Sequence, residues 1–452
     1  MMTMVEMTIP DFGGPETIPE IPAAVYRSRL AKVRDRMRAA QYDCLLVYAD
    51  REHSANMAYC TGFDPRFEEA LLILTADGQT TLCVGNECSG VVSQLPISAD
   101  LALCQEFSLM GQDRSKSWDL APLLRKAGLR KGMRCGIAGW KTLMANRIEV
   151  PTYMVDLVTE ICGARPTNAN DLFMSSKDGL RLENEPEQVA VFEYAAVRTS
   201  LSVMDLLRAL KPGARCFELA RVYDSGGLPD SCHRMVSCGK VIHNGMATPG
   251  NDKIKKGEYM TCALGVWGSL TARAGMLVGD TGAFKSGKGR STLKVIENYL
   301  AVVRAWYAAL GVGTAAGEVF AAAEAARDDS LYTFCVNTGH YIHLDEWLSS
   351  PFWKGSSISL PSGSAIQADI IPVCRVPGIS VNMEDGILLA DAKLRAELKK
   401  RNPALFRRCQ ARRRFMVEDL GYQLSDEVLP LGNIPGAYFP CLLDTGLVCR
   451  HE

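Results

Sequence analysis

The chain has 452 residues, of which 47% are hydrophobic and 22% are charged. This composition is typical of a globular protein, and the length suits two or three domains. The 50 basic side chains nearly balance the 51 acidic ones. No overall field therefore attracts nucleic acid or an anionic membrane, and we expect a small-molecule substrate.

The sequence also predicts a cytoplasmic location. It has no apolar stretch of the roughly 18 residues that a membrane-spanning helix needs. Its first 20 residues contain acids and prolines and lack the basic start and apolar run of a secretion signal. Its 16 cysteines are dispersed without a Cys-x-x-Cys pair. This spacing favours reduced, buried thiols over disulfides or a zinc site.

The first part of the chain predicts an α/β domain of its own, over residues 1–175. Leu30, Val33 and Met37 recur at helical spacing among basic residues, which indicates an amphipathic helix. Short apolar runs then predict strands at 43–49, 70–74 and 81–84, and a helix and strand follow near 118–129 and 134–138.

The remaining residues, 176–452, predict a second domain that begins with a long helix. This helix starts at Glu187 and runs toward Leu210, where Lys211-Pro-Gly ends it. Further helices are expected at 293–310 and 315–327, strands near 258–278, 365–373 and 384–390, and a flexible loop at 282–289.

Several segments in a fixed order suggest a family. They are Tyr26-x-x-Arg-Leu, Asn56-Met-Ala-Tyr-Cys-Thr-Gly-Phe, Arg181-Leu-Glu-Asn-Glu-Pro-Glu, Thr338-Gly-His and Met383-Glu-Asp. With them the chain resembles the creatinase/prolidase superfamily. The resemblance implies a mixed α/β (α+β) fold, in which an N-terminal creatinase-like domain precedes a C-terminal pita-bread catalytic domain.

The central hairpin departs from the metallopeptidases of this superfamily. In those enzymes two aspartates on such a strand pair, a histidine and two later glutamates hold two divalent ions. Residues 257–273 contain no aspartate, and the two aspartate positions correspond to Ala263 and Leu270. Neither side chain offers an oxygen donor to a hard cation. We therefore expect no dinuclear centre, and we predict neither a bound metal nor another cofactor.

The resemblance assigns catalytic roles to four residues. His243 lies in Ile242-His-Asn, where creatinase and prolidase place a histidine that handles the substrate proton, and His340 occupies the Gly-His motif. Asp369 and Glu384 match the positions of the two late glutamates. Histidine takes and gives protons near neutral pH, and the carboxylates would orient and charge-balance it.

Four more residues are predicted to bind the substrate. Arg273 occupies the position of an arginine that helps creatinase hold its substrate, and His343 lies three residues after His340. In creatinase an N-terminal loop covers the active site of the partner subunit with a Phe and an Arg. The resemblance therefore implies a homodimer in which Arg66 and Phe67 play this part, and an arginine fork suits a substrate carboxylate.

The leading hypothesis is a metal-independent hydrolase. It would cleave a non-peptide C–N bond, in an amide or amidine, of a small carboxylate-bearing metabolite by histidine acid/base catalysis. Three alternatives stay open: a C–N or C–S lyase that uses the same site, a binding protein without catalysis, and an enzyme with a single metal ion. The last would hold its ion through three side chains and water.

Overall fold

The computed structural model describes residues 2–244 and 247–451, except for the side chains of residues 243 and 244. Its helices and strands give the mixed α/β class that the sequence predicts. In these two ranges no helix combines the length and the apolar character needed to cross a membrane.

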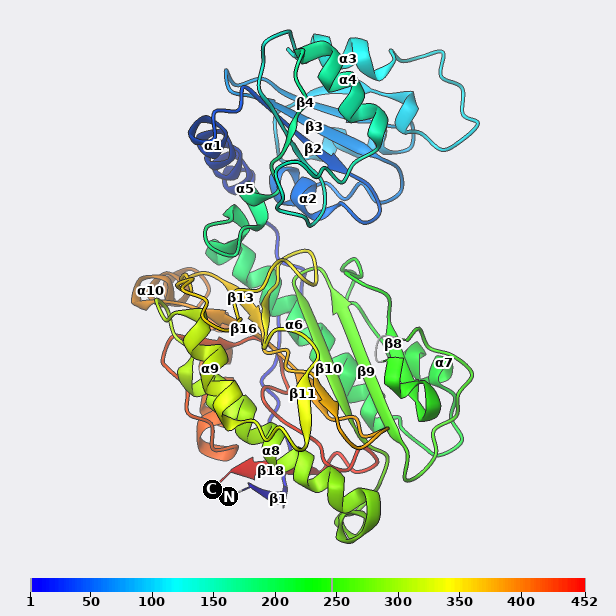
Figure 1. The fold of residues 1–452 in the computed structure, drawn as a ribbon, viewed down its shortest axis with the longest axis vertical. Coiled ribbons are helices and arrows are strands. Elements are labelled where there is room, and N and C mark those ends of the chain that lie inside the picture. Colours follow the sequence, from blue (N-terminus) through cyan, green and yellow to red (C-terminus); the bar gives the residue numbers. More distant parts are fainter. Residues whose placement is uncertain (1, 245–246, 452) are drawn as a thin grey trace. The chain divides into compact units, whose positions relative to one another are not determined.

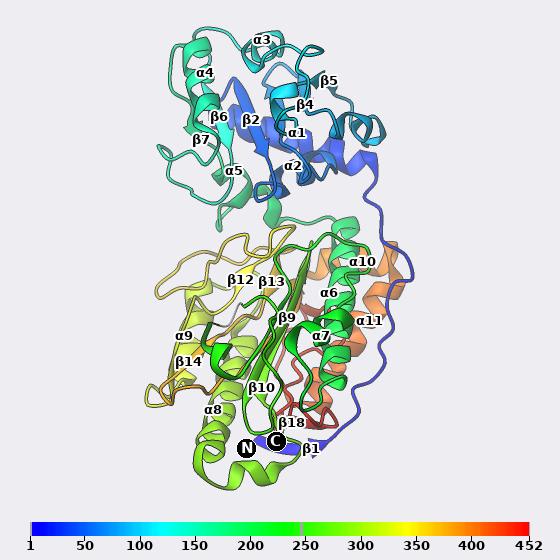
Figure 2. The same ribbon diagram turned by 90° about the vertical axis from the view of Figure 1, so that its right-hand side faces the viewer.

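The chain forms two compact units. The smaller is Ile21–Arg181, and the larger combines Met1–Glu20 with Leu182–Glu452. The expected division, 1–175 and 176–452, therefore differs in one main respect, because the first 20 residues belong to the larger unit. They do so because β1 (Met2–Glu6) pairs with β18 (Leu447–His451) at the other end of the chain, as Figure 2 shows.

The smaller unit is built on one mixed sheet of six strands in the order β5-β4-β3-β2-β6-β7 (Figure 1). The strands are β2 (Cys44–Ala49), β3 (Ala70–Thr75), β4 (Thr80–Val84), β5 (Asp100–Leu103), β6 (Cys135–Ala138) and β7 (Thr167–Asn168). β2 runs antiparallel to β3 and parallel to β6. β2 and β3 are buried along their whole length, which their unbroken apolar runs predict.

Five helices accompany this sheet. They are α1 (Ala23–Ala39), α2 (Ala55–Thr61), α3 (Leu120–Lys126), α4 (Thr152–Cys162) and α5 (Asp171–Met174). α1 buries Leu30, Val33 and Met37, so the amphipathic helix expected from their spacing is confirmed. Leu124 of α3 and Val158 of α4 belong to one apolar cluster with side chains of β2 and β3. This cluster is the core of the unit.

The larger unit contains two sheets of four antiparallel strands each. The first has the order β15-β10-β9-β8 and the second the order β12-β13-β16-β17. The strands of the first are β8 (Met235–Cys238), β9 (Tyr259–Val266), β10 (Ser269–Met276) and β15 (Asn382–Glu384). Those of the second are β12 (His340–Tyr341), β13 (Ala365–Gln367), β16 (Gly386–Leu389) and β17 (Val428–Pro430). Asp385 alone separates β15 from β16, so the chain passes there directly from one sheet to the other.

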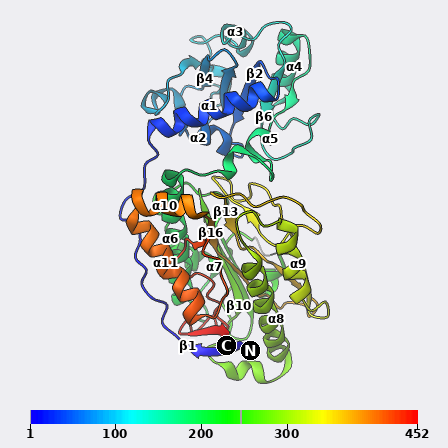
Figure 3. The same ribbon diagram turned by 90° about the vertical axis from the view of Figure 1, so that its left-hand side faces the viewer.

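Helices cover these sheets, and a further strand pair joins β11 (Tyr332–Phe334) to β14 (Pro372–Cys374). The helices are α6 (Pro186–Arg208), α7 (Cys216–Leu219), α8 (Gly287–Ala309), α9 (Ala316–Ala326), α10 (Ala392–Arg401) and α11 (Pro403–Arg414). α6, the long helix expected from Glu187, packs against β9 and β10. α11 lies beside α6 (Figure 3), where Arg408 and Arg412 form ion pairs with the fully buried Glu193.

The expected flexible loop at 282–289 is wrong. The segment forms a short 3-10 helix, Thr281–Lys285, and then the first turn of α8, which begins at Gly287. Gly289 allows the start of α8 to pack closely against the 3-10 helix, because a Cβ atom there would lie 1.9 Å from the carbonyl oxygen of Ala283. Helix propensity disfavours glycine, so the sequence alone argued against a helix that tight packing requires.

Candidate functional site

The site is centred on His340, and the backbone conformation of the preceding residue, Gly339, positions it. Gly339 has φ +98°, and a Cβ atom there would lie 3.0 Å from both the Gln367 carbonyl oxygen and the Trp306 ring. Only glycine combines this backbone conformation with this close approach. The Trp306 indole N–H donates to the Thr338 carbonyl at 2.7 Å. The segment before β12 is thus fixed, and His340 pairs with Gln367 of β13.

The His340 ring is fully buried among three carboxylates. Its Nε2 lies 3.3 Å from Glu346 Oε1, 3.6 Å from Glu384 Oε1 and 4.0 Å from Asp369 Oδ2. Its Nδ1 lies 3.1 Å from the Tyr341 carbonyl oxygen. An Nδ1–H that donates to this carbonyl fixes the tautomer, and Nε2 then faces the carboxylates.

Solvent reaches this cluster mainly at Glu346. The Glu346 side chain is 22% exposed, whereas those of Asp369 and Glu384 are each 6% exposed and that of His340 is 0% exposed. The next residue, Trp347, stacks on the His340 ring with centroids 4.2 Å apart and planes 18° apart. The imidazole is therefore held between an indole face and a group of carboxylates.

Burial and charge shift the pKa values of the cluster. Burial raises the pKa of Asp369 to about 7, since His340 only partly offsets it and Glu346 adds to the increase. Burial and the Asp369 charge raise the pKa of Glu384 well above its ordinary value. Burial alone would lower the pKa of His340, but Glu346 and Glu384 outweigh it and raise that pKa well above its usual range.

Gln367 orients Glu384 from β13, a strand of the other sheet. Its Nε2 donates to Glu384 Oε1 at 3.1 Å and to the Leu270 carbonyl at 2.6 Å. The sequence analysis assigned neither Gln367 nor Glu346 to the site. Strand pairing places Gln367 opposite His340, and Glu346 follows His340 by six residues in an acidic Asp-Glu-Trp segment. That acidic segment is the one local signal that could have identified Glu346.

The central hairpin presents an apolar face beside Glu384. Ala272 of β10 pairs with Ala263 of β9 on one side and with Glu384 of β15 on the other. Ala263, Leu270, Ala272 and Met235 form a small buried apolar cluster. The two positions expected to lack metal ligands thus lie together on this face. A two-ion centre does not fit here, because no oxygen-bearing side chain among these four residues could bridge the ions.

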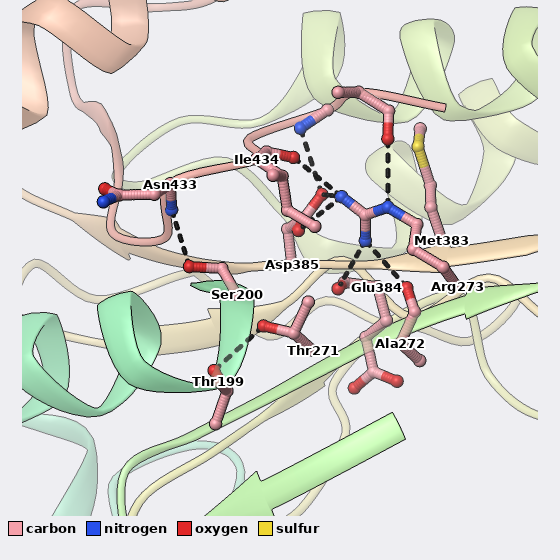
Figure 4. A network of polar contacts seen from close by, with 12 residues as sticks. Thr199, Ser200, Thr271, Ala272, Arg273, Met383, Glu384, Asp385, Asn433 and Ile434 are labelled. Carbon is pink, nitrogen blue, oxygen red and sulfur yellow. Dashed lines mark hydrogen bonds and ion pairs between the residues drawn. The ribbon is translucent and has the colours of Figure 1, made fainter. Parts of the chain in front are cut away.

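Arg273, expected to hold the substrate, is instead part of the core, and this expectation needs correction. Its side chain is 1% exposed. One terminal nitrogen, Nη2, donates to both Asp385 oxygens at 2.9 and 3.0 Å (Figure 4). Its nitrogens also donate to the carbonyl groups of Ala272, Glu384, Ile434 and Ala437. Along a strand, side chains alternate between faces, so Arg273 points away from the apolar face that carries Ala272.

The other predicted site residues are His343, Arg66, Phe67 and His243. His343 is fully buried, and its ring contacts the Phe192 ring edge to face, with the ring centroids 5.2 Å apart. Arg66 binds Asp64 at 2.9 Å, and Phe67 is 68% exposed; both belong to the smaller unit. The side chain of His243 lies outside the described residues, although its backbone falls in a 3-10 helix, Gly239–Asn244. Their roles stay predictions, whereas His340, Asp369 and Glu384 do converge.

Comparison with known proteins agrees with this architecture. Residues 29–140 match the family model of the creatinase/prolidase N-terminal domain. The solved Xaa-Pro dipeptidase from Bacillus anthracis is similar, with a TM-score of 0.62 and 17% identity, over 81% of this chain and 96% of that chain. The chain has the prolidase fold. No curated protein sequence matches it.

Two further structures share the prolidase fold at similar distance. Dipeptidase PepE from Mycobacterium ulcerans has a TM-score of 0.63 and 19% identity, over 82% of this chain and 95% of that chain. The prolidase from Pyrococcus furiosus has a TM-score of 0.62 and 17% identity, over 79% and 96%. These matches show the fold that the resemblance implies. The expected likeness to metal-free creatinase stays a prediction, because identities this low establish the fold alone.

Proposed function

We propose that the protein is a hydrolase that cleaves a C–N bond of a small molecule at the His340 cluster. The observation that carries the proposal is the convergence of a buried imidazole with Glu346, Asp369 and Glu384 at the junction of the two sheets. Imidazole and carboxylate groups at this range can relay protons to a leaving nitrogen and from an attacking water. The solved structures with the same fold are named as dipeptidases and prolidases, which also cleave C–N bonds.

The finer part of the proposal is a substrate other than a peptide. It is supported by the apolar face of Ala263, Leu270 and Ala272, which removes the donors of a two-ion peptidase centre. Peptide hydrolysis is the second candidate, because the names of the similar structures favour it. The substrate carboxylate was expected to bind Arg273 and Arg66. Since Arg273 is engaged in the core, only Arg66 remains as its proposed partner.

The sequence-based hypothesis of catalysis without a metal depends on His243. In that version His243 would protonate the leaving nitrogen and activate water, while Asp369 and Glu384 orient the site. His243→Ala should then abolish turnover in a protein that retains its native circular dichroism spectrum. Unchanged turnover in this variant would remove His243 from the mechanism and leave proton transfer to the His340 cluster.

A substrate panel tests the proposal. The purified chain would be assayed with amides and amidines of small acids and with Xaa-Pro dipeptides, and the released ammonia, amine or proline would be measured. We expect turnover of an amide or amidine that is lost in His340→Ala. Cleavage of Xaa-Pro dipeptides that depends on His340 would establish the second candidate instead.

Product mass separates the remaining alternatives. A hydrolase incorporates one oxygen from labelled water into its product, whereas a lyase yields an unlabelled alkene product. A thermal shift with a panel compound that is never converted would indicate a binding protein and would contradict the proposal.

A further inference from the structure

With its three carboxyl groups ionised, the His340 cluster would carry more negative than positive charge. Three carboxylates, from Glu346, Asp369 and Glu384, face one imidazole. Among the described residues, no lysine or arginine forms an ion pair with any of the three. Buried carboxylates without a compensating cation are costly, so a cluster of this kind calls for a positive partner.

The distances around His340 do not suit a simple ion pair. A charge-assisted N–H···O bond is typically about 2.7–2.9 Å long and joins one donor to one main acceptor. Nε2 instead lies 3.3 and 3.6 Å from Glu346 and Glu384. When a metal holds nitrogen and oxygen ligands at about 2.0–2.2 Å in a tetrahedron, those ligand atoms are separated by about 3.3–3.6 Å. The distances from Nε2 to the Glu346 and Glu384 oxygens match the separation of two ligand atoms in such a tetrahedral site.

Two buried atoms of the cluster also lack hydrogen-bond partners within the described part of the chain. They are His340 Nε2 and Asp369 Oδ1. Both residues are at least nine-tenths buried, at 0% and 5% exposed. Buried polar atoms are nearly always satisfied, so these two atoms point to a ligand that binds at the centre of the cluster.

We infer that His340, Glu346 and Glu384 bind one divalent cation through His340 Nε2 and one oxygen of each glutamate. One ligand atom from each residue lies within 4.8 Å of the other two. Asp369 is adjacent and available as a further donor or as an orienting group. This inference departs from the sequence-based expectation of a metal-free site. Its catalytic meaning rests on the proposed function, whereas the binding itself does not.

Glu346 is the residue that makes a single-ion site feasible. The aspartate positions of the hairpin, Ala263 and Leu270, offer no oxygen, and Glu346 supplies a donor from the segment after β12 instead. One imidazole and two carboxylates suit zinc or manganese, and three side chains leave a coordination position open. A divalent ion there would supply Lewis acidity to the bound substrate. Gln367 would keep Glu384 oriented, because it already donates to Glu384 Oε1 at 3.1 Å.

Titration calorimetry on the full-length protein tests the inference. After dialysis against a chelator, the protein would be titrated separately with zinc chloride and manganese chloride. We expect one ion per chain for at least one metal. Glu346→Gln, His340→Ala and Glu384→Gln should each weaken its affinity at least about tenfold, because loss of a direct ligand should cost no less than loss of an outer-shell partner, which costs about 10–100-fold. Circular dichroism would verify that each variant is folded.

Glu324→Gln is the matched control, because Glu324 pairs with Arg327 at the surface and is 42% exposed. This variant should bind the ion like the parent protein. Two ions per chain, no ion of either metal, or an affinity unchanged by Glu346→Gln would each overturn the inference. Because no substrate enters this measurement, one tight ion without turnover would refute the proposed hydrolase and leave the metal site standing. Turnover in metal-free protein would support the hydrolase and show that catalysis does not need the ion.

Discussion

Replacing Asp385 by asparagine should destabilise the larger unit strongly. Arg273 is 1% exposed, and Asp385 is its one carboxylate partner among the described ion pairs. Asparagine keeps one oxygen but turns an amide N–H₂ group toward the guanidinium, so a buried cation loses its counter-charge. Removing one partner of a buried pair costs about 3–5 kcal/mol. The Gly436 N–H, which donates to Asp385 Oδ2 at 3.0 Å, is disturbed as well.

The assay is chemical denaturation followed by circular dichroism, with Arg273→Met as the second single variant. The double variant, Arg273→Met with Asp385→Asn, should lose less free energy of unfolding than the two single losses combined, since no unpaired charge remains. Glu324→Gln, which breaks the surface pair with Arg327, should cost at most about 1 kcal/mol. If Arg273→Met unfolded like the parent protein but lost substrate affinity, Arg273 would be a binding residue after all.

Two further predictions concern pH and the glycine before His340. Burial and Arg304 lower the pKa of His451 from 6.5 to about 4. The unfolded chain therefore binds a proton that the folded chain does not, and stability falls as pH drops through this window. The test is the loss of unfolding free energy between pH about 7.5 and pH about 5. This loss should be about 1–2 kcal/mol smaller in His451→Gln than in the parent protein. An equal loss in both proteins would contradict the prediction. Gly339→Ala should cost about 1–3 kcal/mol in thermal melts, because φ is +98° and its Cβ atom would crowd the Gln367 carbonyl. It should also weaken metal binding, and unaltered melting and affinity would show that the backbone tolerates a side chain there.

Much of the fold could be predicted from local patterns. The apolar spacing of α1 and the unbroken apolar runs of β2 and β3 are properties of neighbouring residues, so the sequence shows them directly. The resemblance identified His340 through its Gly-His motif, and the φ of +98° at Gly339 shows why that position needs glycine. Asp369 and Glu384 followed from the resemblance, which matches them to the positions of the two late glutamates.

The rest depended on partners that are distant in the sequence. Arg273 was taken for a substrate-binding residue because its partner, Asp385, lies 112 positions away in the chain. Arg412 of the basic helix α11 is likewise buried against a distant partner, Glu193, 219 positions away. No local pattern distinguishes a buried arginine from an exposed one until its carboxylate partner is known.

The prediction of the site was incomplete for a related reason. Expectations followed the positions that the family pattern marks, so Glu346 and Gln367, outside that pattern, received no role. The charge balance of the cluster becomes visible only when His340 and the three carboxylates are seen together. The close approach of three carboxyl groups to one imidazole is what changes the expectation from a metal-free site to a site for one ion.

Anomalous X-ray diffraction from crystals grown with manganese or zinc tests this central claim most directly. The account predicts one anomalous peak per chain, within about 2.0–2.2 Å of His340 Nε2 and of one oxygen each from Glu346 and Glu384. It predicts no peak beside Ala263 and Leu270, where the hairpin offers only apolar side chains. A pair of peaks flanking the hairpin, or an ordered cluster without any peak, would contradict it.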